Sequence, residues 1–163
     1  MTLICNAGPV IALAKINRLS LLQDLAEAVL IPEIVLHEVL AKPGLDASRI
    51  LNATRSFLNV RPPPECVDPS VIFAARHLDA GEKQVIALAS SIPAPVTAVL
   101  DDAAGRRVAA QIGLPLIGFI GILLVAKQRR LVTSICPLLE DARCQGYWLS
   151  DELLGIAKAL ASE

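Results

Sequence analysis

The stretch VTAVLDDAAGRR, Val96–Arg107, leads from an apolar run through two adjacent aspartates into a segment with helical character. Val96–Leu100 has the length and apolar character of a buried strand. Asp102 then stands where a helix N-cap is expected, ahead of a helix from Ala103 to Ile112. A buried strand that leads directly into a helix is typical of a parallel sheet with helices on its faces.

The same alternation continues on both sides of this stretch. Further strands are predicted at Leu3–Cys5, Val29–Ile31, Phe57–Val60 and Leu114–Ile117. Further helices are predicted at Val10–Ile16, Leu21–Ala28, Pro32–Leu40, Asp46–Arg55, Asp68–Leu78, Asp79–Ser91, Gly118–Arg130, Ser134–Gln145 and from Ser150 to Leu160. The sequence therefore predicts an α/β protein, a three-layer α/β/α sandwich with a central, mostly parallel sheet. We expect one domain over residues 1–163, with a helical C-terminal extension over about residues 133–163.

Length and composition limit the classes of protein that fit. The 163 residues suit one domain, and with 54% hydrophobic but 3% aromatic residues the core must consist of Leu, Ile, Val and Ala. The net charge of −1 gives no overall basic field, so a polyanionic partner would need a local patch helped by a metal. The cysteines form no C-x-x-C pair and follow no secretory leader, which indicates reduced thiols in a cytoplasmic protein.

Two other classes of protein are excluded by specific residues. Val108–Ala126 carries no formal charge and is long enough to span a bilayer. Gly113, Pro115 and Gly118 interrupt it, so we expect a helix end, a strand and a new helix in a soluble protein, with no membrane contact. His37-Glu38 begins like the zinc-protease motif H-E-x-x-H, but position 41 is alanine.

Polar side chains follow two of the predicted strands directly. Asn6 follows the first strand, and Asp101 and Asp102 follow the strand at Val96–Leu100. In an open parallel sheet, ligands bind in the crevice outside the carboxyl ends of the strands. Each residue also has a simpler interpretation: Asn6 as a turn former and Asp102 as a helix cap. A cap explains only one aspartate, and a carboxylate that extends a buried strand is costly unless something compensates it.

Two glutamates complete the candidate site. Glu38 lies at the rim of the apolar face of its helix, where it is either solvated or directed at the crevice. Asp79-x-x-Glu82 matches a capping box, which satisfies helix amides without any catalytic role. Four carboxylates and one amide near one crevice would raise each other's pKa values unless cations were bound. Mg²⁺ or Mn²⁺ suits such oxygen ligands and supports phosphodiester hydrolysis.

At this point a family resemblance becomes visible. The chain resembles the PIN-domain family of metal-dependent ribonucleases, and within it the branch of short prokaryotic proteins similar to VapC-type toxins. The resemblance covers nearly the whole chain and continues into Gly146–Ser150. Four stretches carry it: ICNAGPVIALAKI (Ile4–Ile16), IPEIVLHEVL (Ile31–Leu40), LDAGEKQVIALA (Leu78–Ala89) and VLDDAAGRRVAAQIGLPLIGFIGILLVAK (Val99–Lys127).

The resemblance implies a site and an activity. The metal ligands of the family fall on Asn6, Glu38, Glu82 and the pair Asp101-Asp102, of which we favour Asp102; the four acids are the expected catalytic residues. The expected cofactor is Mg²⁺ or Mn²⁺, and the expected activity is endoribonucleolytic cleavage by the toxin of a type II toxin–antitoxin pair. An RNA substrate, a cognate antitoxin and a homodimer are the implied partners.

The chain departs from the family pattern at its first motif. The family typically has an aspartate there, followed by hydroxyl residues, whereas this chain has Asn6, Ala7 and Gly8. The departure motivates an alternative function, a catalytically weak or inactive PIN-fold module that binds or regulates. A phosphoryl-transfer enzyme with an aspartyl-phosphate is a third possibility, but no glycine loop to cradle phosphate supports it.

Two arginines follow the tandem aspartates, and each has two interpretations. Arg106 lies four residues after Asp102 and is expected to pair with it along the helix. Arg106 and Arg107 are also the candidate RNA-binding residues, through contacts to phosphates. Aromatic residues are scarce, so extended base stacking along a single strand is not expected.

Overall fold

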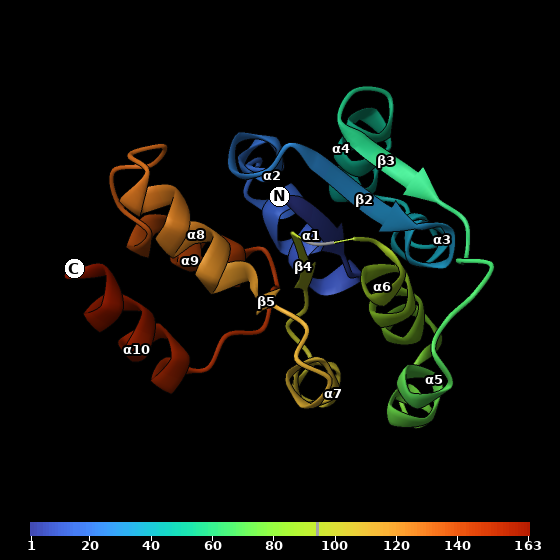
Figure 1. Cartoon of the computed structure of the whole chain (residues 1–163). Helices are drawn as coiled ribbons and strands as arrows, with labels where there is room; N and C mark the ends of the chain where they lie inside the picture. Colours follow the sequence, from blue (N-terminus) through green and yellow to red (C-terminus); the bar gives the residue numbers. More distant parts are fainter. Residues whose placement is uncertain (94) are drawn as a thin grey trace.

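The computed structural model describes residues 1–93 and 95–163 and contains a five-stranded sheet at its centre (Figure 1). The strands lie in the order β3-β2-β1-β4-β5, and each neighbouring pair is parallel. This confirms the predicted α/β class and its parallel sheet. The strands are β1 (Thr2–Cys5), β2 (Ala28–Pro32), β3 (Leu58–Arg61), β4 (Val96–Val99) and β5 (Leu116–Ile117).

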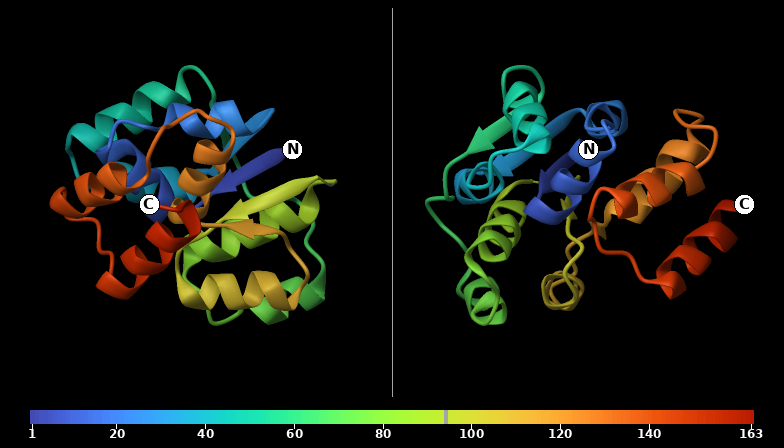
Figure 2. Two further views of the ribbon diagram at one scale, coloured as in Figure 1. Left: turned by 90° about the vertical axis from the view of Figure 1, so that its left-hand side faces the viewer. Right: turned by 180° about the vertical axis from the view of Figure 1, so that it is seen from behind.

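Helices flank the sheet on both faces. α6 packs against β1, β2 and β4, with α5 and α7 beside it, while α1 packs with α4 and α8 in the layer on the other side. α8, α9 and α10 lie together at one side of the molecule (Figures 1 and 2). The helices are α1 (Ala7–Lys15), α2 (Ser20–Leu25), α3 (Glu33–Leu40), α4 (Leu45–Thr54), α5 (Pro69–Ala75), α6 (Ala80–Ser91), α7 (Ala103–Gln111), α8 (Phe119–Gln128), α9 (Cys136–Cys144) and α10 (Asp151–Ala161).

The core is aliphatic, as the composition predicts. Among the largest fully buried side chains, Phe119 is accompanied only by leucines and isoleucines in the part of the chain that the structure describes. β1 and β4 are central in the sheet and almost continuously buried, because helices cover both of their faces. The low aromatic content therefore reflects a core of branched aliphatic side chains between closely packed layers.

Several predicted boundaries differ from the structure. Pro32 was expected in the first turn of a helix, but it is the last residue of β2 and precedes α3 with an extended backbone, φ −61° and ψ 145°. The pairing of β1 with β2 ends at Leu30, so the missing N–H of Pro32 removes no ladder bond to β1. The helix predicted to reach Ala28 ends at Leu25, since Ala28 already belongs to β2.

The uncharged segment Val108–Ala126 is interrupted as predicted. α7 ends within it, Gly113 adopts a left-handed conformation with φ 72°, and β5 and the start of α8 follow. Across the described residues, none of the helices combines the length and the apolar character needed to cross a bilayer.

The topology brings distant segments to one edge of the sheet. Asn6 follows β1 and Asp101 follows β4, and the backbone N–H of Asn6 donates to the carbonyl of Val99 at 3.0 Å. α3 begins at the same edge, directly after β2, and the start of α6 points toward it because α6 must run back before β4 begins. The predicted site residues therefore share the carboxyl edge of the sheet.

Candidate metal and nucleic-acid site

Asp102 is the N-cap of α7, as the sequence predicts. Its Oδ1 accepts hydrogen bonds from the backbone N–H groups of Ala104 at 2.7 Å and Gly105 at 3.2 Å. Burial acts to raise the pKa of this carboxyl, but those N–H groups and a hydrogen bond from Glu82 outweigh it, and the net pKa is lowered. Asp102 is therefore a carboxylate held in place by the helix that it starts.

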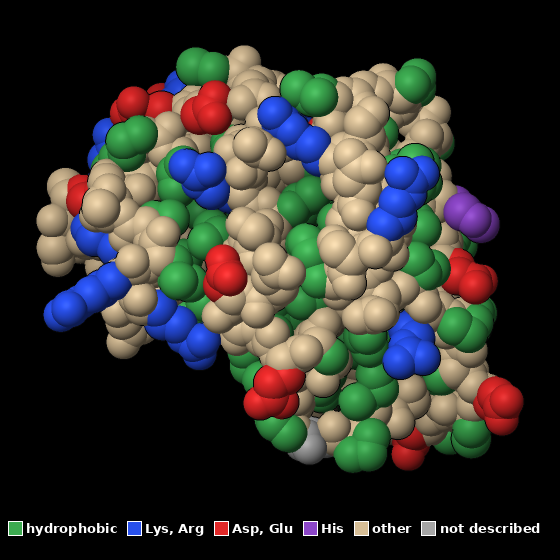
Figure 3. Space-filling view, turned by 90° about the horizontal axis from the view of Figure 1, so that it is seen from above, with side chains coloured by type: hydrophobic (Ala, Val, Ile, Leu, Met, Phe, Trp, Pro, Cys, Tyr) green, Lys and Arg blue, Asp and Glu red, His purple; other side chains and the backbone are tan. Residues whose placement is uncertain are grey.

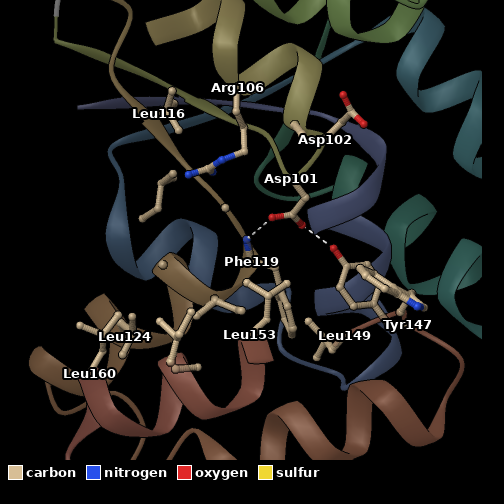
Figure 4. Close-up of a pocket in the computed structure, with 18 residues that line it drawn as sticks. Asp101, Asp102, Arg106, Leu116, Phe119, Leu124, Tyr147, Leu149, Leu153 and Leu160 are labelled. Atoms are coloured by element: carbon tan, nitrogen blue, oxygen red, sulfur yellow. Dashed lines mark hydrogen bonds between the residues drawn. The ribbon is translucent and has the colours of Figure 1, made fainter. Parts of the chain in front are cut away.

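The side chain of Asp101 points away from that of Asp102, as Figure 4 shows. Its Oδ1 accepts from the backbone N–H of Phe119 at 2.9 Å, at the start of α8, and its Oδ2 accepts from the hydroxyl of Tyr147. Burial and the charge of Asp101 both raise the pKa of Tyr147, so the phenol remains a donor. Both oxygens of Asp101 are thus occupied by structural hydrogen bonds. The two aspartates therefore have different structural roles: Asp102 caps α7, and Asp101 holds the start of α8.

Glu82 is the most buried acid at this edge. It is only 3% exposed, and its backbone N–H donates to Oδ1 of Asp79 at 2.8 Å, which is half of the predicted capping box. Burial raises the pKa of Glu82 to about 7, with further contributions from the hydrogen bond to Asp102 and the charges of Asp79 and Asp102. A raised pKa for Glu82 beside a lowered pKa for Asp102 is expected of two crowded carboxyl groups.

Asn6 and Glu38 meet around Gly81. A Cβ built on Gly81 would lie 3.2 Å from Oε2 of Glu38 and 3.3 Å from Oδ1 of Asn6. Asn6 is 9% exposed at the start of α1, whereas Glu38 is exposed to solvent on α3. The absence of a side chain at position 81 lets the two oxygens approach the start of α6. The sequence analysis did not identify this glycine.

Gly105 makes a second close approach of the same kind. A Cβ at this position would lie 3.0 Å from Oε1 of Glu82, so an alanine here would displace the buried carboxyl. Glycine inside a helix costs about 1 kcal/mol relative to alanine. A glycine within a predicted helix therefore indicates a position where a side chain would be in the way. Gly81 and Gly105 are therefore the small residues next to Glu38, Glu82 and Asp102, which we call the acidic cluster.

Four of the five predicted ligands form two separate local pairs at this edge of the sheet. Asn6 and Glu38 adjoin Gly81, and Glu82, the next residue along α6, adjoins Asp102. Within residues 1–93 and 95–163, no three His, Cys, Asp or Glu side chains lie close enough together to hold a metal ion. The donor types nevertheless fit a hard divalent cation, because a buried carboxyl with a raised pKa beside a second carboxylate is stabilised by added positive charge.

The two arginines behave differently from one another. Nη1 of Arg106 donates to the carbonyl of Leu100 at 3.0 Å, and the expected ion pair between Arg106 and Asp102 is not formed in the described structure. That prediction was wrong, because the end of β4 offers a partly buried carbonyl within reach of the guanidinium. Arg107 is exposed on α7. Contacts of either arginine to RNA stay a prediction.

A large apolar groove opens next to Asp101 (Figure 4). The cavity has a volume of about 870 Å³ and is lined by β5, α7, α8, α10 and the segment before α10. Trp148 at its rim is 78% exposed, and Ile156 and Leu160 of α10 also present apolar surface. Asp101, Asp102 and Arg106 stand at one end of the groove, which the sequence analysis did not locate.

The sheet order, the acidic cluster and the sequence motifs agree with one family. The chain belongs to the PIN domain family, since the family model described as DUF3368, PIN domain, matches residues 2–163. No curated protein matches the chain. The match confirms the resemblance at the level of the family.

Proposed function

We propose that this protein is a divalent-metal-dependent endoribonuclease of the PIN type. Glu38, Glu82 and Asp102 would hold Mg²⁺ or Mn²⁺, and Asn6 would add a neutral oxygen where the family has an aspartate. The observation that carries the proposal is the buried Glu82, whose pKa of about 7 results from its burial and from its pairing with Asp102 at the carboxyl edge of the sheet. A carboxyl pair of this kind favours the binding of a cation.

The residues of the chain have distinct roles in this proposal. A bound divalent ion would stabilise charge on the phosphodiester as it is cleaved. Asp102 is fixed by its bonds to α7 and presents a carboxylate at a constant position. Glu82, buried beside Asp102, would hold the ion from the start of α6. Asp101 orients α8 and Tyr147 and acts as a positioning residue.

The biological role that we propose is that of a cytoplasmic toxin with a cognate antitoxin, acting as a homodimer. The apolar groove beside Asp101 supports the existence of a protein partner, because an exposed Trp148 and the apolar side chains of α10 are costly to leave in water. The four free cysteines are consistent with a reducing compartment.

The test is cleavage of a mixed RNA pool by purified protein with Mn²⁺, Mg²⁺ or EDTA. We expect cleavage that depends on the metal and is abolished by Asp102→Asn. Asp24→Asn is the matched control, since Asp24 is exposed on α2, away from the carboxyl edge. Full activity of the Asp102→Asn protein would refute the assignment.

A second function is favoured by one specific observation. Asn6 removes a negative charge from the site, and Ala7 and Gly8 remove the hydroxyl groups that the family pattern includes. Without these groups the protein would bind its ligand through the PIN fold and not cleave it. A thermal shift distinguishes the two functions: stabilisation by millimolar Mn²⁺ supports the nuclease, and an unchanged melting temperature supports the binding module.

A further inference from the structure

A second cavity lies between α5 and α7 and has a volume of about 710 Å³. Its apolar lining includes Leu78, Ala104 and Val108. Arg76, His77 and Arg107 also line it, and all three are exposed. An apolar floor with cationic and hydrogen-bonding groups around it is the combination that a nucleotide requires, with its flat base and its charged phosphate.

The cavity is adjacent to the acidic cluster along the chain and in space. His77 and Leu78 directly precede Asp79, which caps the helix that carries Glu82. On the other wall, the backbone N–H of Ala104 is bonded to Asp102. α5, α6 and α7 pack against one another, with α5 and α7 at the lower end of the molecule in Figure 1 and α6 above them. The walls of the cavity are thus continuous with the segments that hold the two coupled carboxyl groups.

The charge around the cavity is locally positive, although the whole chain has a net charge of −1. Among its lining residues in the described structure there are two arginines, one histidine and no carboxylate. The ion pairs that residues 1–93 and 95–163 form leave Arg76 and Arg107 without an acidic partner. By contrast, acidic and basic side chains are interspersed on the face seen in Figure 3. The cavity therefore attracts an anion from outside the chain.

An exposed aromatic ring stands beside the basic groups. Phe73 is 66% exposed, and the guanidinium of Arg76 lies over its ring, 3.9 Å from the centroid. Nη1 of Arg76 also donates to the carbonyl of Phe73 at 2.7 Å, which fixes the arginine against the ring. Such an Arg–aromatic pair offers stacking surface to a base and a charge to its phosphate at the same time.

We propose that this cavity is a binding subsite for single-stranded RNA next to the acidic cluster. One base stacks on the Phe73–Arg76 pair, and Arg76 and Arg107 contact the flanking phosphates. This inference rests on the proposed RNA substrate and adds to it the path that the strand follows away from the cleavage position. A single stacking platform agrees with the small number of aromatic residues in the chain.

The test measures binding separately from cleavage. A fluorescein-labelled RNA of about 12 nucleotides and random sequence is titrated with protein, once in EDTA and once in Ca²⁺, with fluorescence anisotropy as the readout. We expect Arg76→Gln and Arg107→Gln each to weaken binding about fivefold. Each should also lower the slope of log K against log salt by about 0.7, the value for one lost phosphate contact on a single strand.

Two further variants complete the series. Phe73→Ala should weaken binding about fivefold or more through the loss of stacking and leave the salt slope unchanged, because no charge is removed. Arg55→Gln is the matched control, since Arg55 is exposed just before β3, at the opposite edge of the sheet. It should bind RNA like the wild-type protein.

The outcomes separate this subsite from the nuclease activity. The subsite is overturned, and the nuclease left intact, if the wild-type protein cleaves RNA in a metal-dependent way while Arg76→Gln, Arg107→Gln and Phe73→Ala all bind RNA as tightly as the wild type. Absent cleavage with binding that still depends on Arg76, Arg107 and Phe73 supports the subsite and overturns the nuclease. If Phe73→Ala converts a dimer to a monomer in light scattering without a loss of RNA affinity, the surface is a protein interface and the subsite is refuted.

Discussion

Replacing Glu82 with glutamine should make the metal-free protein more stable while removing its response to metal. Glu82 is buried and its pKa is raised from 4.5 to about 7, so ionising it in the folded protein costs free energy. Between these two values the folded state binds more protons than the unfolded chain, so the free energy of unfolding decreases as the pH rises through this window. Glutamine has nearly the same shape and never ionises.

The magnitude follows from the size of the shift. The full displacement of the Glu82 pKa corresponds to about 3 kcal/mol. The cluster opens to solvent at Asp102, and screening there reduces the expected gain for Glu82→Gln to about 2 kcal/mol above pH 7. For a domain of this size that is an increase in Tm of about 4–8 °C, and it should nearly vanish at about pH 4, below the pKa of the unfolded chain.

The measurement is thermal and urea unfolding in EDTA across that pH range, followed by circular dichroism. Glu65→Gln, in an exposed loop, is the matched control and should change neither the stability nor its pH dependence. With Mn²⁺ the order should reverse, because only the wild-type protein gains stability from the ion. A Glu82→Gln protein that is less stable than wild type at about pH 8 in EDTA, or whose difference is independent of pH, would refute the coupling between burial and charge.

Three other predictions concern separate parts of the molecule. Gly81→Ala should reduce the Mn²⁺-induced rise in Tm, because the added Cβ lies within 3.3 Å of two oxygens that we propose as metal ligands, whereas Gly155→Ala, with nothing within 4 Å, should preserve it. Asp101→Asn should lower the free energy of unfolding by about 2 kcal/mol, and its effect should be non-additive with that of Tyr147→Phe in a double-mutant cycle by urea unfolding. Cys5, which is buried and has a pKa raised to about 12 by burial, should react with a thiol reagent only after unfolding, and immediate reaction in the native protein would contradict its placement.

Local sequence patterns predicted much of the fold. Short apolar runs located each of the five strands, and the cap residues Asp79 and Asp102 located the starts of α6 and α7. These features depend on neighbours within a few residues, so the sequence carries them directly. Boundaries such as that of Pro32 failed because the pairing with an adjacent strand decides where a strand ends, and that partner is distant in the sequence.

The candidate site was predicted in composition and only partly in geometry. The rule that parallel strands present their carboxyl ends at one edge is enough to bring Asn6 and the tandem aspartates together. It does not say which aspartate points where. That depends on the start of α8, 18 residues beyond Asp101, and on Tyr147, 46 residues beyond it.

The sequence by itself determined which residue types this protein has to offer and the order in which strands and helices present them. Only the tertiary structure decided that Glu82 is buried against Asp102, that Gly81 and Gly105 leave space for the acidic side chains, and that two cavities flank the cluster. The physical reason is that a charge, a clash or a cavity is a property of side chains that meet across the fold. Their distances are set by the packing of whole layers, which no short stretch of sequence specifies.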